Sequence, residues 1–354
     1  MFKNYIFDPK NPTNRYSFEI YDIDLSIVNA IRRIILSDIE IPGMIGENEP
    51  TVEIISSNGP LHNELLIHRI GQIPICLKED EIDNYVDNSI TLELNVSNTT
   101  NTIKNVTTED ITMKRNNKEL DKRELKEIFY PNMVTNSNIL ITRLRENEYL
   151  HFKGSVVKKT GKYNASFSPV SLSTFSYIID NSKITKDMSI LDKERQYFTN
   201  KYGDPNAFQF EIEPINKYIT PKYLLNKSFE ILITKLNNLI TNIKSNENFE
   251  IEKKLENTFK YIIEDEDDTI GFLIQSFIHD KYVRNGDTYL ENIKCKYCGY
   301  ICPHPLKKIL EIQVTLENQT DEMKFKDFLQ SNCLLIIDKL QEIKTEWNLF
   351  TEKK

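Results

Sequence analysis

The sequence predicts an α+β protein in which two similar modules are joined in one chain. Each half of the sequence contains a strand followed by a short amphipathic helix, and each half closes with a long amphipathic helix. A charged segment that is nearly free of aromatic residues separates the two halves. With 354 residues, of which 39% are hydrophobic, the chain can fill more than one sizeable core.

The first module begins with residues 16–23, YSFEIYDI, whose aromatic and β-branched side chains are typical of a strand. Asp24 can cap the helix that follows. On a helical wheel its apolar residues span about 120°, as expected of a core-facing stripe; they are Ile27, Val28, Ile31, Ile34 and Ile35. The other elements predicted here are strands at 51–56 and 207–215, a short helix at 61–70, a hairpin at 139–157 turning near Asn147, and a long helix at 222–243.

Residues 77–138 are polar and contain only short alternating stretches, which indicates a small subdomain inserted into the first module. A second module is predicted from a strand at Phe259–Ile263, a helix capped by Asp268 and a long final helix that includes Trp347. The predicted domains are the first module at 1–76 and 139–243, the insert at 77–138, a charged linker at 244–257 and the second module at 258–354.

Composition narrows the class of function. The net charge of −8 argues against a protein that mainly grips nucleic acid, because phosphate neutralisation needs a basic face. No apolar run reaches the roughly 20 residues of a membrane span, and the start of the chain lacks the apolar core of a secretory signal. Three of the five cysteines cluster between Cys295 and Cys302, unlike a disulfide framework. We therefore expect an intracellular protein with protein partners.

No catalytic constellation is visible in the sequence. The five histidines are scattered, and neither a glycine-rich phosphate loop nor a Ser/His/Asp arrangement can be identified. The acidic run Glu264–Asp268 could bind a divalent metal, but we interpret it as favourable charge at a helix N-terminus. The chain is therefore predicted not to be an enzyme.

Five motifs resemble one family. They are NAIRRIILS at 29–37 with Ile41-Pro42, ELLIHRIGQIP at 64–74, GKYNASFSPV at 161–170, DTIGFL at 268–273 and GYICPHPL at 299–306. In this order they resemble the RNA polymerase α-like subunits: the bacterial alpha N-terminal domain, archaeal subunits D and L, and the third and eleventh subunits of eukaryotic RNA polymerase II. Two positions depart from the usual motif, with Asn164 in place of His and Phe167 in place of Trp.

The resemblance implies a larger and a smaller dimerisation module fused in one chain. Its implied function is a non-catalytic assembly platform that holds two large catalytic subunits together, beside small polymerase subunits, with DNA reached only through the complex. Fused versions of this pair occur in large DNA viruses, which suits the abundance of residues with A/T-rich codons; such a protein would occupy the virion and the host cytoplasm. The insert should be metal-free, because no cysteine lies between Cys76 and Cys295.

Two sets of site residues follow from the helical wheel and the resemblance. The first set is expected to contact a large subunit rather than only solvent, and comprises Asn29, Arg32, Arg33 and Leu36, with His68 and Arg69. The second set is expected to pair the modules, and comprises Ile27, Ile31, Ile34, Ile35, Ile270, Leu273, Phe277, Ile336 and Leu340. Because the linker is short, we expect pairing within one chain and a monomer.

The run from Cys295 to His304 leaves one alternative open. Cys295, Cys298, Cys302 and His304 offer four possible zinc ligands within ten residues. However, a closed site needs all four to converge, and Cys302 and His304 lie in a motif with a structural role in the family. We predict no cofactor, with a zinc-dependent nucleic-acid-binding regulator as the alternative function.

Overall fold

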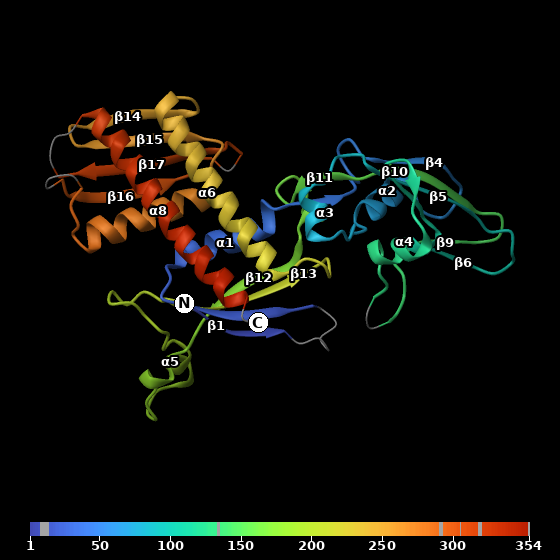
Figure 1. Cartoon of the computed structure of the whole chain (residues 1–354), viewed down its shortest axis with the longest axis horizontal. Helices are drawn as coiled ribbons and strands as arrows, with labels where there is room; N and C mark the ends of the chain where they lie inside the picture. The colour runs from blue at the N-terminus through green and yellow to red at the C-terminus, as the bar shows by residue number, and fades with distance from the viewer. Residues whose placement is uncertain (8–13, 133–134, 290–292, 305, 318–320, 353–354) are drawn as a thin grey trace.

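The computed structural model describes residues 1–7, 14–132, 135–289, 293–304, 306–317 and 321–352. Its helices and sheets form two adjoining modules at one end of the molecule and a separate sheet-rich domain at the other end (Figure 1). The predicted α+β class is confirmed. The two modules contain the long helices, whereas the distal domain contains only short ones.

The first module is a four-stranded antiparallel sheet covered by two helices. Asp24 caps the first helix by accepting a hydrogen bond from the Ser26 amide at 2.8 Å. The predicted isoleucine stripe of this helix is at most 7% exposed, so that prediction is confirmed. In order across the sheet, the strands are β1 (Phe2–Phe7), β2 (Tyr16–Tyr21), β13 (Ala207–Pro214) and β12 (Val170–Tyr177), and the helices are α1 (Leu25–Ser37) and α6 (Pro221–Ser245).

The second module repeats this arrangement. The helix α7 (Asp268–Ile278) continues into a π-helical turn, η4 (His279–Arg284), and the chain closes with α8 (Glu322–Thr351). Across its antiparallel sheet the strands are β14 (Phe249–Leu255), β15 (Thr258–Glu264), β17 (Ile309–Leu316) and β16 (Cys295–Ile301).

The segment predicted as a linker, 244–257, is mostly structured. It contains the end of α6 and the whole of β14, and only Asn246–Asn248 separates them. Asn246 ends α6 with a left-handed backbone at φ 56°, a conformation that asparagine tolerates well. The prediction failed because β14 is an edge strand, and edge strands carry the exposed charges that also mark linkers.

Helices α6 and α8 join the two modules. They lie antiparallel, since Glu230 accepts from Lys344 at 2.9 Å near one end and Asn246 accepts from Lys326 at 2.9 Å near the other. In Figure 1 they run side by side from the sheet of the second module toward the sheet of the first. Residues of both modules belong to one continuous apolar cluster, so pairing occurs within this chain.

Trp347 of α8 packs into the core of the first module. This residue belongs to α8 of the second module, yet its ring centroid lies 5.0 Å from Phe2 and 4.8 Å from Phe18 of the first sheet. It is fully buried. Of the residues predicted to pair the modules, all are buried except half-buried Phe277. They lie on helices α1, α7 and α8, and α7 contacts both of the others.

The distal domain is larger than the predicted insert. The strand β10 pairs with both β4 and β5, so segments assigned to the first module share a sheet with residues 77–138. The five-stranded sheet contains, in order, β4 (Val52–Ser57), β10 (Tyr149–Ser155), β5 (Ile90–Ser97), β7 (Thr112–Arg115) and β8 (Lys118–Glu119). Around it lie β6 (Lys104–Thr107), β9 (Leu140–Leu144), η1 (Thr108–Asp110), α2 (Asn63–Gly71), α3 (Glu79–Asp83) and α4 (Lys122–Ile128).

The predicted hairpin at 139–157 is wrong. Its two strands exist, and Asn147 lies between them with a positive φ of 62°. However, β9 pairs with β6, whereas β10 pairs with β4 and β5. Alternation along the sequence identifies a strand but not its partner, so a non-local pairing was mistaken for a local one.

A narrow ribbon connects the distal domain to the first module. It consists of β3 (Glu40–Gly43) and β11 (Val157–Thr160), which pair antiparallel where the chain leaves and re-enters the module. The short η2 (Ala165–Phe167) follows it, and the excursion between β12 and β13 carries η3 (Asn181–Lys183) and α5 (Ile190–Glu194). Among the helices that the structure describes, none has both the length and the apolar character of a membrane span.

We predict that Trp347→Ala destabilises both modules. Removing a fully buried tryptophan side chain from a shared core should lower the free energy of unfolding by about 3–5 kcal/mol. Leu349→Ala is the matched control on the same helix, because Leu349 is 54% exposed and its loss should cost less than about 0.5 kcal/mol. Urea unfolding followed by circular dichroism measures both; equal effects of the two substitutions would contradict the shared core.

Candidate functional site at the junction of the two modules

Helices α1 and α7 face each other across the junction and run antiparallel. Near the end of α1, the Arg33 Nε donates to the Thr269 hydroxyl at 2.9 Å. Near its start, the Ser276 hydroxyl donates to the Asp24 carboxylate at 3.2 Å. Arg33 was predicted to contact a large subunit, but its Nε serves the pairing of the modules instead. The helical wheel placed Arg33 outside the isoleucine stripe without showing that α7 covers that side.

The N-terminus of α7 is held by a lysine of the first module. The predicted cap, Asp268, is already the first residue of α7; the cap is Asp267, which accepts from the Thr269 amide at 3.0 Å. The Asp267 carboxylate also accepts from the Lys162 Nζ at 2.8 Å. The Lys162 amide donates to the Ser37 carbonyl at 2.8 Å, so this loop closes on the end of α1. A Cβ on Gly161 would clash with the Leu36 carbonyl oxygen, which explains a glycine there.

A second lysine binds the same region from α6. The Lys235 Nζ lies 3.2 Å from a carboxylate oxygen of Glu266 and 3.6 Å from one of Asp38 at the end of α1. All three side chains are less than 20% exposed. The acidic run therefore does supply charge at the N-terminus of α7, and it also anchors the first module.

These contacts change the ionisation of the two acids in opposite directions. Burial opposes ionisation of Asp267, but hydrogen bonds and the charge of Lys162 outweigh it and hold the pKa of Asp267 well below its usual range. Burial raises the pKa of Glu266, and the nearby Lys235 only partly offsets it. Asp267 is therefore the acid whose charge stabilises the junction most clearly.

Arg32 does not take part in the contact that neighbouring Arg33 makes with α7. Its Nε and Nη2 donate to the Asn29 side-chain oxygen at 3.0 and 2.9 Å, and burial with the charge of Arg33 lowers the pKa of Arg32. No carboxylate pairs with it anywhere in the described part of the chain. Leu36 is half-buried at the border of the shared core. This side of α1 thus presents a half-buried cation that lacks an anionic partner.

His68 and Arg69 lie elsewhere, on α2 of the distal domain. The Arg69 guanidinium donates to the carbonyl oxygens of Ile141 at 3.1 Å and Leu140 at 3.0 Å, which ties α2 to β9. The His68 Nε2 lies 3.2 Å from the Glu47 carboxylate, with both side chains about half exposed. The structure does not bring these two residues together with Arg32, because α1 and α2 belong to different domains (Figure 1).

Three motifs from the first half of the chain meet at one cleft, although they are far apart in sequence. The cleft has a volume of about 130 Å³ and is lined by Ile41-Pro42, Gly71–Pro74 and Ser168-Pro169 among others. A Cβ on Gly71 would lie 2.7 Å from the Gly46 Cα, so the two backbones touch there. These motifs therefore pack together where the distal domain joins the first module.

The cysteine run does not form a convergent site. A bulge in β16 allows both Cys295 and Cys298 to be buried, and each is only 4% exposed. His304 is exposed and its Nδ1 accepts from the Leu306 amide at 3.1 Å. Within the described ranges, no group of three or more His, Cys, Asp or Glu side chains could hold a metal. Burial raises the pKa of the Cys295 thiol to about 11. Pro305 of this motif lies outside the described residues.

Sequence reasoning missed the lysines of the junction. Lys162 and Lys235 form two of the ion pairs between the modules, yet only the position of Lys162 in a recognised motif marked it. Lys235 interrupts the apolar face of α6 and could have been flagged as a charge at a buried position. Its partner could not have been inferred, since Glu266 lies in the other module.

Two α+β modules paired through their long helices define this chain as a self-contained dimerisation platform. The family model described as the RNA polymerase Rpb3/Rpb11 dimerisation domain matches residues 17–236, and a second model with the same description matches residues 258–346. The first match covers more than half of the chain. The protein therefore belongs to the Rpb3/Rpb11 dimerisation domain family and contains that domain twice.

Individual relatives agree with this assignment. The chain is 29% identical over 182 residues to the DNA-directed RNA polymerases I and III subunit RPAC1 of Saccharomyces cerevisiae, covering 45% of this chain and 52% of the relative. It is 29% identical over 176 residues to the DNA-directed RNA polymerase II subunit rpb3 of Dictyostelium discoideum, covering 45% and 53%. A conjugation stage-specific protein of Tetrahymena thermophila is 27% identical over 175 residues, covering 45% and 54%. The chain thus spans about half the length of the curated relatives it matches.

The free energy of unfolding should depend on pH because of Asp267 at the junction. Because the pKa of Asp267 is lower in the folded state than the usual value of about 3.9, its stabilising charge is complete above about pH 5 and is lost as the pH falls below about 4. The substitution Asp267→Asn keeps a side-chain oxygen that can cap α7. It should reduce the loss of unfolding free energy between about pH 5 and about pH 3, because asparagine does not ionise. Lys162 is 41% exposed, so solvent screening limits its coupling with Asp267 to about 0.5–1 kcal/mol.

A double-mutant cycle measures that coupling. Urea unfolding at pH 7 and pH 3 of Asp267→Asn, Lys162→Met and the double variant should give the coupling at pH 7 and a smaller one at pH 3. A coupling of zero at pH 7 would contradict the role of this ion pair.

Proposed function

We propose that this protein is a non-catalytic assembly subunit of a multisubunit DNA-directed RNA polymerase. The observation that carries the proposal is the pairing of two Rpb3/Rpb11 dimerisation domains inside one chain with a common core. Names of relatives that identify RNA polymerase subunits support it. A platform made from one chain keeps a fixed geometry between its two modules, on which larger subunits can be positioned.

The partners would be two large catalytic subunits and small polymerase subunits. Arg32 supports this assignment, because a half-buried guanidinium that pairs with no carboxylate among the described residues is suited to one from a partner. Asn29 orients that guanidinium from the preceding turn of α1. The net charge of −8 fits a subunit that reaches DNA only through the complex.

The chemistry of RNA synthesis would belong to the large subunits. The titratable side chains of the junction form ion pairs and cap helices. Asp267, for example, pairs with Lys162 and caps α7. We propose that the chain needs no cofactor of its own and acts inside the cell. The comparisons give no support to the alternative of a zinc-dependent regulator. A viral origin, with the virion and the host cytoplasm as locations, stays a prediction from the fusion of the two modules.

We predict that Arg32→Glu leaves the chain folded and weakens its binding to the large subunits. Reversing a charge that pairs with a partner carboxylate should lower the affinity about tenfold or more. Arg123→Glu is the control, because Arg123 is an exposed residue of α4 in the distal domain and the substitution reverses the same charge. Affinity capture of the tagged chain, with quantification of co-purifying large subunits, measures the effect. Normal assembly of the Arg32 variant would show that this side of α1 is not the interface.

The purified chain should have no polymerase, nuclease or nucleotide-hydrolysing activity. The physical reason is that neither a phosphate-binding loop nor an acid/base pair serves a substrate in the sequence. Assays with radiolabelled nucleotide and a DNA template check this at each purification step. Turnover that co-elutes with the protein and disappears with a point mutation in this chain would contradict a purely structural subunit.

A further inference from the structure

A long excursion of the first module reaches across to the second module. Residues 178–206 leave the first sheet after β12 and return at β13. Most of the excursion points away from both sheets, and α5 lies at its far end (Figure 1). Its last part turns back toward the start of α1, where the second module also lies.

This last part forms a compact turn. Asn200 organises it, because its side-chain oxygen accepts from the amides of Tyr202 at 2.8 Å and Asp204 at 3.0 Å. Gly203 adopts a φ of +87°, which a glycine allows without strain. A β-bridge between Thr199 and Pro205 closes the base of the turn. The side chains of Tyr202 and Asp204 are thereby fixed on the side that faces the second module.

The turn is also anchored to the first module. The Ile23 amide donates to the Asn206 carbonyl at 3.3 Å, and the Asn206 side chain donates to the Asp22 carboxylate at 3.2 Å. These contacts lie directly before Asp24, the cap of α1, whose carboxylate accepts from Ser276 of α7. The turn and the start of α1 therefore form one polar surface against the second module.

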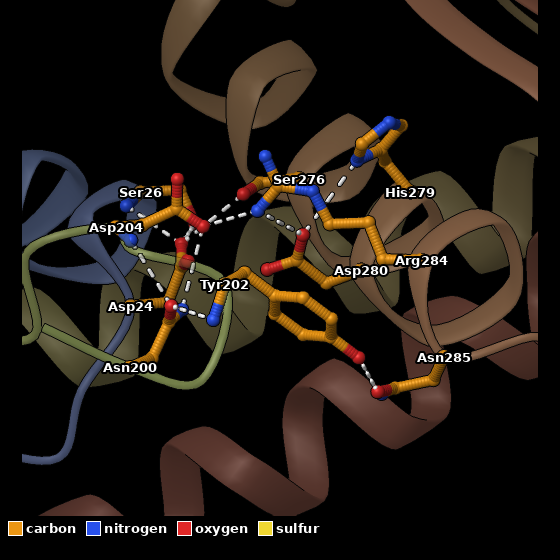
Figure 2. A network of polar contacts seen from close by, with 10 residues as sticks. All are labelled: Asp24, Ser26, Asn200, Tyr202, Asp204, Ser276, His279, Asp280, Arg284 and Asn285. Carbon is orange, nitrogen blue, oxygen red and sulfur yellow. Dashed lines mark hydrogen bonds and ion pairs between the residues drawn. The ribbon is translucent and has the colours of Figure 1, made fainter.

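The second module meets this surface with its π-helical turn. Figure 2 shows Arg284 between two carboxylates, Asp204 of the excursion and Asp280 of its own turn. The Arg284 guanidinium also lies 5.5 Å from the Tyr202 ring centroid, and the Tyr202 hydroxyl donates to Asn285. Burial and the nearby Asp24 raise the pKa of Asp280, and the charge of Arg284 partly offsets this rise. His279, 3.6 Å from Asp280, completes the group.

We propose that residues 198–206 are a strap between the modules, which binds the π-helical turn at 279–284 and limits rotation of the second module about the α6–α8 contact. The junction described above holds α7 at its N-terminus, through Lys162 and Lys235. The strap holds the opposite end of the same helix, so α7 is fixed at two points. Fixing both ends prevents a pivot that a single ion-pair cluster would allow. The strap acts inside the chain and does not depend on any polymerase partner.

Hydrogen–deuterium exchange of the full chain tests the strap. Asp204→Arg places two cations together and should speed exchange of the amides at 279–285 by about threefold to tenfold. Asp187→Arg is the control, because it makes the same charge change at an exposed residue of the same excursion. The swap Asp204→Arg with Arg284→Asp should restore slow exchange at least in part. Exchange in β10 of the distal domain reports whether each variant is folded.

Three results would overturn the strap: unchanged exchange at 279–285 in Asp204→Arg, the same acceleration in Asp187→Arg, or no recovery in the swap. If Asp204→Arg loses protection throughout the chain, Tyr202→Phe decides the question, since it removes only the hydroxyl that donates to Asn285. Faster exchange confined to 279–285 in that variant supports the strap, and exchange equal to that of the wild type overturns it.

Discussion

The arrangement of the two modules depends on the antiparallel contact between α6 and α8. Each helix starts in its own module and ends against the other, so neither sheet is covered by its own helices alone. Trp347 illustrates the consequence, because a side chain from the last helix completes the core beneath the first strands of the chain. Burial of apolar area on this scale supplies most of the association energy between modules. The modules can therefore be regarded as two halves of one folding unit.

The polar contacts around α1 and α7 have a different role. Apolar contact between two helices holds them together but leaves their rotation loosely defined, whereas hydrogen bonds and ion pairs fix direction. Lys162 and Lys235 fix one end of α7, and the contacts of Asp24 and Arg284 fix the other. The assembly subunit proposed above would need such a defined geometry to position large partners. The ribbon of β3 and β11 connects the distal domain to these paired modules.

Much of the fold could be predicted from sequence because helical periodicity reports which face is buried. The stripe from Ile27 to Ile35 and the cap at Asp24 were correct for that reason. Periodicity does not report the partner, so it could not show that Trp347 enters the other module or that Arg33 meets Thr269. The edge strand β14 resembled a linker because its exposed Glu and Lys side chains hide the alternation of Phe249 and Ile251. The contact of Asn29 and Arg32 with a large subunit stays a prediction, and the lysines that bind across the junction depend on tertiary contacts that the sequence pattern does not report.

The mass of the purified protein in solution, measured by light scattering, tests most directly whether the two modules pair with each other within one chain. Only Asn246–Asn248 separates α6 from β14, so the second module stays at an effective concentration on the order of millimolar near its partner surface. Pairing within one chain predicts a monomer of 41.6 kDa across the accessible concentration range. A stable dimer of twice that mass would contradict it, because the modules would then be exchanged between chains or the surface between them would be misassigned.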